Sequence, residues 1–286
     1  MTWVKKAADA GDAWGLNSLG VVFWEGKYPS LKENPDTITA AKYFQKSAEQ
    51  DWAGGQVNFG LANLEVAVDN PDFPLAAKLF TRAADQGAIE GFLNLGIQQL
   101  RGQGIPQDRA SALSQFVTVA DHAKQNHRAG AEAYLGALYA EGKGGVTQDF
   151  KQAHHWFSLA NEDAPDPEMQ MLIGCFHLAG LGVSQNPEKA RLWLEKSVQG
   201  GNQHGAKALR ALQNGANVDH RRGVAFLEHL GVCEPITSRS IFDEQSVSPK
   251  GMPFVDPLYP TQYAFIIIYV FVNRFHASTF IEQIIN

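Results

Sequence analysis

The sequence is poor in cysteine and has no excess of positive charge. Only two of its 286 residues are Cys, which excludes a small scaffold held together by disulfides. Its 24 Lys and Arg are outnumbered by 30 Asp and Glu, which argues against a nucleic-acid binder because such proteins usually carry a basic face. Charged residues make up 19% of the chain, too few for a coiled coil or an acidic disordered tail. The 44% of hydrophobic residues is enough for a sizeable core.

Two residue patterns repeat along the chain. An apolar residue precedes Gly at five places, 36 to 40 residues apart: Leu19-Gly20, Phe59-Gly60, Leu95-Gly96, Leu135-Gly136 and Ile173-Gly174. An aromatic series runs between these pairs: Trp3, Phe44, Phe80, Phe116, Trp156 and Trp193. Small residues lie mainly three before and four after each aromatic residue, on one face of a helix. The patterns predict two helices in each unit of about 40 residues.

The glycines of the first pattern indicate how the helices pack. Gly inside a helix costs about 1 kcal/mol relative to Ala, so five of them at one register must be compensated. We expect the compensation to be close approach of the aromatic-bearing helix, whose ring fills the space between units. A unit built in this way needs its neighbours in order to fold. The predicted fold is all-α: a right-handed α-α superhelix of about five helix pairs over residues 1–215.

The segments between the helices carry helix-end signals. Gly102, Gly142 and Gly180 follow the glycine-bearing helices and suit a left-handed C-terminal cap. Residues suited to an N-cap lie seven or eight positions before the aromatic residues: Asp36, Asp72, Asp108, Asp149 and Asn186. Pro187 suits the first helical position after Asn186.

These residues resemble the Sel-1-like repeat family, a relative of the tetratricopeptide repeat. The best match runs from Ala133-Tyr-Leu-Gly-Ala-Leu-Tyr-Ala-Glu-Gly142 through Asp149 to Ala153-His-His-Trp-Phe-Ser-Leu-Ala160, and the resemblance covers residues 1–215. It implies an α-solenoid that acts as a non-enzymatic protein–protein interaction scaffold or adaptor. Its partners would be other proteins or extended peptides, with no nucleic acid and no cofactor.

The two ends of the chain depart from the repeat. Trp3 falls where the aromatic residue of a second helix belongs, so we expect a chain that opens in mid-repeat; a short capping helix is the alternative. After the repeats we expect a capping helix within 216–233, a Pro- and Ser-containing linker over 234–262 and a short hydrophobic tail over 263–286. The ten apolar residues 263–272 would form a helix of about 15 Å, half of the hydrocarbon core of a bilayer. The sequence therefore favours no membrane span; a membrane contact through this tail, as in the membrane-tethered quality-control adaptors of the family it resembles, is the alternative.

Catalytic and metal-binding patterns are weak. His154 and His155 are adjacent, so on a helix they point about 100° apart and cannot easily face one ion. Cys175 and His177 diverge in the same way, and Cys233 adds no recognised ligand spacing. The sequence therefore predicts no metal site and no enzyme. A cleft between repeats that binds a small molecule or carries out catalysis is the alternative, and convergence of His154, His177 and Asp149 would favour it.

A row of residues on the glycine-bearing helices is the candidate binding surface. These residues lie just before, and three after, the apolar member of each pair, so they share a helix face away from the glycine. The candidate binding residues are Asn58, Asn94, Gln98, Tyr134, Leu138 and Phe176. The amides would bind peptide backbone and the apolar members would accept side chains. The alternative is that the apolar members pack between adjacent units.

Overall fold

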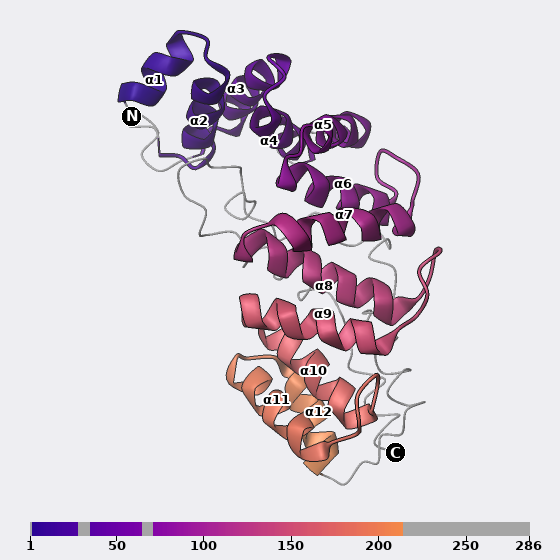
Figure 1. Ribbon diagram of the computed structural model, residues 1–286. Coiled ribbons are helices and arrows are strands. Elements are labelled where there is room, and N and C mark those ends of the chain that lie inside the picture. The colour runs from indigo at the N-terminus through magenta and orange to yellow at the C-terminus, as the bar shows by residue number, and fades with distance from the viewer. Residues whose placement is uncertain (1, 28–34, 65–70, 214–286) are drawn as a thin grey trace. The chain divides into compact units, whose positions relative to one another are not determined.

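The computed structural model describes residues 2–27, 35–64 and 71–213, and every regular element in these ranges is an α-helix (Figure 1). The helices are α1 (Thr2–Asp9), α2 (Ala13–Trp24), α3 (Thr37–Glu49), α4 (Ala53–Leu64), α5 (Phe73–Asp85), α6 (Ile89–Arg101), α7 (Arg109–His122), α8 (Gln125–Glu141), α9 (Phe150–Asp163), α10 (Pro167–Ala179), α11 (Pro187–Gln199) and α12 (Gln203–Gln213). The all-α prediction is confirmed. The expected segments 216–233, 234–262 and 263–286 lie outside the described residues.

The described helices divide into two compact units. The first unit runs to Val119 and the second starts at Ala120, so the division falls inside α7. Within each unit the glycine-bearing helices, called A helices here (α2, α4, α6, α8 and α10), pack against the B helices that follow them, as in the pairs α2–α3, α4–α5, α8–α9 and α10–α11. Each unit therefore contains the predicted helix-pair arrangement.

The predicted helix ends are confirmed. Carboxylate or amide oxygens of Asp36, Asp72, Asp149 and Asn186 accept hydrogen bonds from the first-turn backbone N–H groups of α3, α5, α9 and α11, and Asp108 accepts one from Ser111 N at 2.9 Å. Gly102, Gly142 and Gly180 adopt left-handed conformations, with φ between 61° and 68°. These short polar caps and glycines satisfy backbone groups that a helix end leaves without partners.

The glycines of the A helices face large side chains of the B helices, as predicted. A methyl group added to Gly20 would lie 2.5 Å from the ring of Phe44, and one added to Gly60 would lie 2.6 Å from Phe80. The corresponding partner of Gly96 is Phe116. No side chain fits at such distances, so the absence of a Cβ atom is what lets the two helices approach.

In the second unit the expected partners of two glycines are wrong by one residue. Gly136 faces Phe157, and Gly174 faces Leu194. Phe157 and Leu194 are 1% and 0% exposed, whereas the predicted Trp156 and Trp193 are only partly buried.

The physical reason is that the small residues flank the buried side chain four before and three after it. This register is shared by all five B helices, and every residue in it is at most 1% exposed: Ala40, Phe44 and Ser47; Ala76, Phe80 and Ala83; Ala112, Phe116 and Val119; Ala153, Phe157 and Ala160; Ala190, Leu194 and Ser197. A helix face defined by positions i−4, i and i+3 excludes the residue just before the central one, because adjacent residues point about 100° apart.

A second close contact lies one and a half turns earlier on several A helices. A methyl group on Gly15, Gly55 or Gly91 would meet the backbone of the helix in front of it, α1, α3 or α5, at 2.5 to 2.8 Å. The sequence interpretation did not single out these glycines, although they precede Gly20, Gly60 and Gly96 by a constant five residues. Two glycine contacts therefore hold each A helix of the first unit between neighbouring B helices.

Candidate binding surface

Of the predicted binding residues in the first unit, Asn58 is fully buried. Its exposed fraction is 0%, and its Nδ2 donates a 2.9 Å hydrogen bond to Oδ1 of Asn17. Asn17 lies on α2 and Asn58 on α4, so this amide pair joins two A helices. Because buried amides need hydrogen-bond partners, the pair contributes to the stacking of the repeats.

Asn94 and Gln98 lie one turn apart on α6 with different exposure. Asn94 is partly buried, and its Nδ2 donates to the carbonyl oxygen of Glu90 at 2.8 Å. Gln98 is 2% exposed, and among the described residues its Oε1 has no hydrogen-bond partner. Asn94 is the member of this pair that solvent can reach.

The three predicted residues of the second unit are buried as well. Tyr134 and Leu138 on α8 are 3% and 2% exposed, and Phe176 on α10 is 0% exposed. The ring of Phe176 meets those of Phe150 and Phe157 edge to face, with centroids 6.2 and 5.9 Å away. Of the six predicted residues, Asn94 alone is not buried. Ligand recognition by this row stays a prediction.

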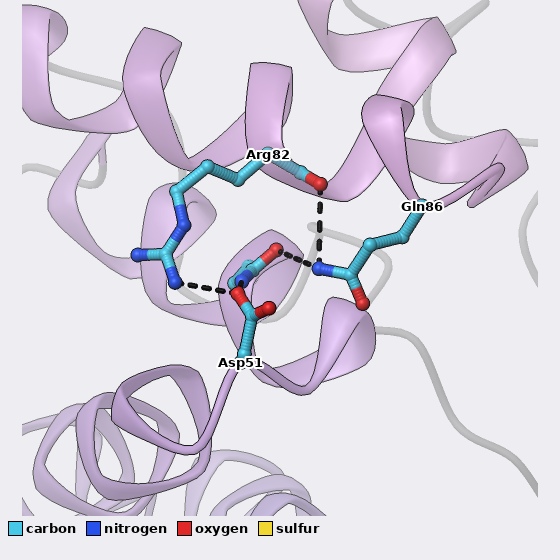
Figure 2. A network of polar contacts seen from close by, with 4 residues as sticks. Asp51, Arg82 and Gln86 are labelled. Carbon is cyan, nitrogen blue, oxygen red and sulfur yellow. Dashed lines mark hydrogen bonds and ion pairs between the residues drawn. The ribbon is translucent and has the colours of Figure 1, made fainter.

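A polar network around Asp51 joins the turn between α3 and α4 to α4 and to the C-terminal end of α5 (Figure 2). Asp51 Oδ1 accepts hydrogen bonds from Arg82 Nη2 at 2.5 Å and from Gln56 Nε2 at 2.6 Å. Gln86 Nε2 donates to Gln56 Oε1 at 2.9 Å and to the carbonyl oxygen of Arg82 at 3.3 Å. The hydrogen bonds from Arg82 and Gln56 lower the pKa of the Asp51 carboxyl.

The backbone of Asp51 is unusual for a residue with a side chain. Its φ is +62°, and the same place after α1, α5 and α11 is held by Gly11, Gly87 and Gly201, all with positive φ. Residues other than Gly adopt this conformation rarely, with Asp and Asn the most tolerant. The side chain that Asp51 brings to this position is the one that organises the network in Figure 2.

Several large apolar side chains remain exposed on the described helices and turns. Ile38 is 67% exposed on α3, Trp52 is 41% exposed in the turn before α4, and Leu192 is 56% exposed on α11. Trp3 on α1 is 81% exposed, with the Lys6 ammonium 5.1 Å from its ring centroid. Sequence reasoning assigned Ile38, Trp52 and Leu192 no role, because single apolar residues off the repeat register carry no signal.

Trp52 also occupies a position that favours a different residue type. It is the N-cap of α4, since its carbonyl oxygen accepts from Gln56 N at 2.9 Å. The corresponding residues before α2 and α12, Asp12 and Asn202, cap their helices through side-chain oxygens. An indole cannot accept such a hydrogen bond, so α4 begins without a side-chain cap.

The second unit contains a buried acidic group beside an ion pair. The guanidinium of Arg128 on α8 forms a two-pronged hydrogen bond with the Asp163 carboxylate of α9, with Nη2 2.7 Å from Oδ1. Glu132 is 3% exposed, and its Oε1 lies 3.8 Å from Arg128 Nε. Burial, reinforced by the Asp163 charge, raises the pKa of Glu132 to about 7.

His154 and His177 meet, but the predicted acid is not with them. Their ring centroids are 5.1 Å apart and the ring planes are nearly perpendicular, at 76°. Asp149 caps α9, where its Oδ1 accepts from Lys151 N and Gln152 N. The Asp149 carboxylate is thus engaged in capping α9. The convergence of His154, His177 and Asp149 that would favour catalysis is therefore incomplete.

The described residues contain neither a metal-binding cluster nor a membrane-spanning helix. Residues 2–27, 35–64 and 71–213 bring together no group of three or more His, Cys, Asp or Glu that could hold a metal ion. Within the same ranges, none of the helices combines the length and the apolar character needed to cross a membrane. Cys175 is buried, its Sγ lies 3.6 Å from Met171 Sδ, and burial raises the pKa of its thiol.

Stacked pairs of short helices with glycine contacts define a helical-repeat protein, a class that binds its ligands along the surface of the repeats. The Sel1 repeat sequence profile matches residues 15–52, 68–87, 93–114, 129–163 and 167–202, which together exceed half of the chain. The chain therefore belongs to the Sel1 repeat family, as the sequence resemblance indicated.

The solved structures that are similar to this chain include two Sel1-type repeat proteins. A protective antigen of uropathogenic Escherichia coli strains that displays an SLR fold aligns with a TM-score of 0.64 and 25% identity over 81% of this chain and 48% of its own. This chain thus spans about half of that protein. A Sel1 repeat protein from Oxalobacter formigenes aligns with a TM-score of 0.57 and 23% identity over 71% of this chain and 79% of its own. The second likeness concerns the fold alone.

Proposed function

We propose that the protein is a non-enzymatic scaffold that binds another protein or an extended peptide. Sel1 repeat proteins are typically protein–protein interaction scaffolds. The observation that carries the proposal for this chain is the exposure of Ile38 and Trp52 in the first unit, 67% and 41%. The repeat register accounts for the buried side chains of α3 and does not need either residue.

Trp52 is the stronger of the two candidates. Aromatic residues, and Trp above all, are enriched among the residues that dominate binding energy at protein interfaces. At this position Trp replaces a side-chain N-cap, a choice that costs about 1 kcal/mol of helix stability relative to Asp or Asn. A residue that is poor for local stability and half exposed fits a role in binding. We propose Asn94, the accessible member of the predicted row, as a polar contact.

The test uses the full chain and a Trp52→Asn variant. Affinity capture from extracts of the source cells identifies a partner, which is then purified and titrated against both proteins. The new N-cap offsets the lost contact of the half-buried indole, so the free energy of unfolding should change by less than about 1 kcal/mol. Binding should nevertheless weaken at least tenfold.

Two further variants complete the test. Asn94→Ala should weaken the same interaction by a smaller factor, because it removes an accessible polar contact. Leu192→Ser removes an exposed apolar side chain from the second unit and serves as the control, with unchanged affinity. Equal affinities for wild type, Trp52→Asn and Asn94→Ala would contradict the proposed surface. Turnover of a substrate by the purified chain would contradict the non-enzymatic assignment.

A further inference from the structure

The contact between His154 and His177 has features of a proton-sensitive site. Their rings meet edge to face with centroids 5.1 Å apart. Nε2 of His154 and Nδ1 of His177 are both buried, and neither has a hydrogen-bond partner among the described residues. Neutral imidazoles tolerate this arrangement, but a proton added at either of these two nitrogens would create a charge that no hydrogen-bond acceptor among the described residues contacts there.

Apart from burial, the groups that most affect the pKa values of the two imidazoles are lysine and histidine side chains. Lys189 on α11 acts on both imidazoles, and the exposed His155 acts on His154 from its own helix. Helix α8 also packs against α9. Its last residue, Glu141, is paired with Lys143, with Oε1 3.6 Å from Nζ. Phe176 covers His154 from α10, with centroids 5.9 Å apart.

Burial and the neighbouring positive groups act in the same direction. They lower the pKa of His154 to about 4, and burial lowers that of His177 as well. At the other end of the α9–α10 pair, the pKa values of two acidic side chains are shifted upward instead. Burial raises the pKa of Glu168, in the first turn of α10, to about 7, although Asn202 Nδ2 donates to its carboxylate at 2.5 Å. The pKa of Glu132, which lies near Asp163 at the end of α9, is also raised to about 7.

The histidines are distributed unevenly between the two units. All nine lie between His122 and His276, so the helices α1 to α6 contain none. Two carboxyls of the first unit with a shifted pKa, Asp51 and Asp108, are shifted downward. These groups of the first unit therefore do not titrate between pH 5 and 7.5.

We propose that the His154–His177 contact is an acid-sensitive joint in the second unit. Protonation of either imidazole separates the last turn of α10 from α9, while the helices of the first unit keep their packing. The sign follows from linkage: a histidine whose pKa is lower in the folded state stabilises the fold above pH 6.5, and this contribution is lost as the pH falls toward 4. Between pH 7.5 and 5.0 the His154 contribution corresponds to an about 30-fold loss of protection.

Hydrogen exchange followed by mass spectrometry on the full chain tests this proposal. Protection factors of peptides from α9 and α10 are measured at pH 7.5 and 5.0, after correction for intrinsic exchange, in wild type and His154→Phe. The ratio of wild-type to variant protection should fall about 30-fold between the two pH values. The opposing effect of Glu168 is the same in both proteins and cancels in this ratio. His155→Phe, the same change at the exposed neighbour, keeps His154 and should retain most of the pH-dependent loss of protection, because burial is the largest cause of the lowered pKa of His154.

A second measurement keeps the proposal testable if His154→Phe does not fold. Titration of the imidazole resonances of the wild-type chain by NMR should place the pKa of His154 near 4. An ordinary value near 6.5, or a ratio of protection factors that does not change with pH, would overturn the proposal. So would an equal loss of protection in α3 and α5 of the wild type over the same pH range.

Discussion

The two units of this protein fill the same helical repeat in different ways. In the first unit each A helix carries two glycines five residues apart, and a buried amide pair joins α2 to α4. In the second unit the earlier glycine is replaced by Ala131 on α8 and Met169 on α10, both at most 2% exposed, while Gly205 on α12 keeps a close contact with Ser197. The second unit also buries Glu132 and the histidine contact. One repeat frame therefore supports a first unit held by close backbone contacts and a second unit with buried groups that titrate.

The largest expected effect tests whether the second unit uses the same B-helix register as the first. Phe157→Ala removes a fully buried ring packed against Gly136 and should lower the free energy of unfolding by about 3 to 5 kcal/mol. Trp156→Ala removes a larger but partly exposed side chain and should cost much less. Urea denaturation followed by circular dichroism measures both. A greater loss for Trp156→Ala would restore the register expected from sequence.

A smaller change in stability should come from the buried carboxyl of Glu132, which lies beside the Arg128–Asp163 ion pair. Because the pKa of Glu132 is raised to about 7 in the folded chain, its ionisation opposes folding as the pH rises from 4.5 through 7. Glu132→Gln should therefore stabilise the protein at pH 8 by about 1 to 3 kcal/mol and make little difference at pH 4.5. Thermal unfolding at the two pH values provides the measurement. Equal stabilisation at both would show that the carboxyl is not the cause.

The amide pair of the first unit should contribute a comparable or smaller amount. Asn58→Ala removes the donor to Asn17 Oδ1 and leaves a small void between α4 and α2, which should cost about 1 to 3 kcal/mol. Asn94→Ala, on the neighbouring A helix but partly exposed, is the matched control and should cost less. Denaturation midpoints at pH 7 compare the two. A larger loss for Asn94→Ala would exclude a structural role for the buried pair.

The smallest expected difference concerns Asp51, which stands where other repeats have glycine. Asp51→Gly gives up the Arg82 and Gln56 interactions but removes the unfavourable left-handed conformation, so the denaturation midpoint should hardly change. Asp51→Ala loses the same interactions and keeps the strain, so its midpoint should be lower. If the two variants are equally stable, backbone strain at this position is negligible.

The sequence predicts the helix ends and the glycine contacts because each has one physical explanation. A helix interior with Gly needs a close neighbour, and Asp or Asn before an apolar-periodic segment suits an N-cap. The partner of Gly136 was not predicted correctly because Trp156 and Phe157 are adjacent, and both lie three or four residues from Ala153 and Ala160. Spacing alone does not choose between them. The packing does, because only Phe157 shares the Ala153–Ala160 face in the i−4, i+3 register.

The candidate site was predicted less well than the fold. The positions of Asn58 and Asn94 on their helices are equivalent, yet one is buried and the other is not. The difference depends on Asn17, 41 residues before Asn58, which no local pattern connects to it. Likewise, the meeting of His154 with His177 depends on how α9 and α10 pack. Contacts between repeats are set by tertiary packing, to which a one-dimensional pattern is insensitive.

The glycine contacts also determine which sequence changes the repeats can absorb. The opposing group is a phenyl ring at Gly20, Gly60, Gly96 and Gly136, and it is Leu194 at Gly174, where an added methyl group would lie 2.9 Å from Cγ. A larger residue on an A helix therefore requires a smaller side chain at the opposing position of its B helix. Sequence variation at these glycines should therefore appear as compensated pairs, with a smaller side chain on the opposing B helix.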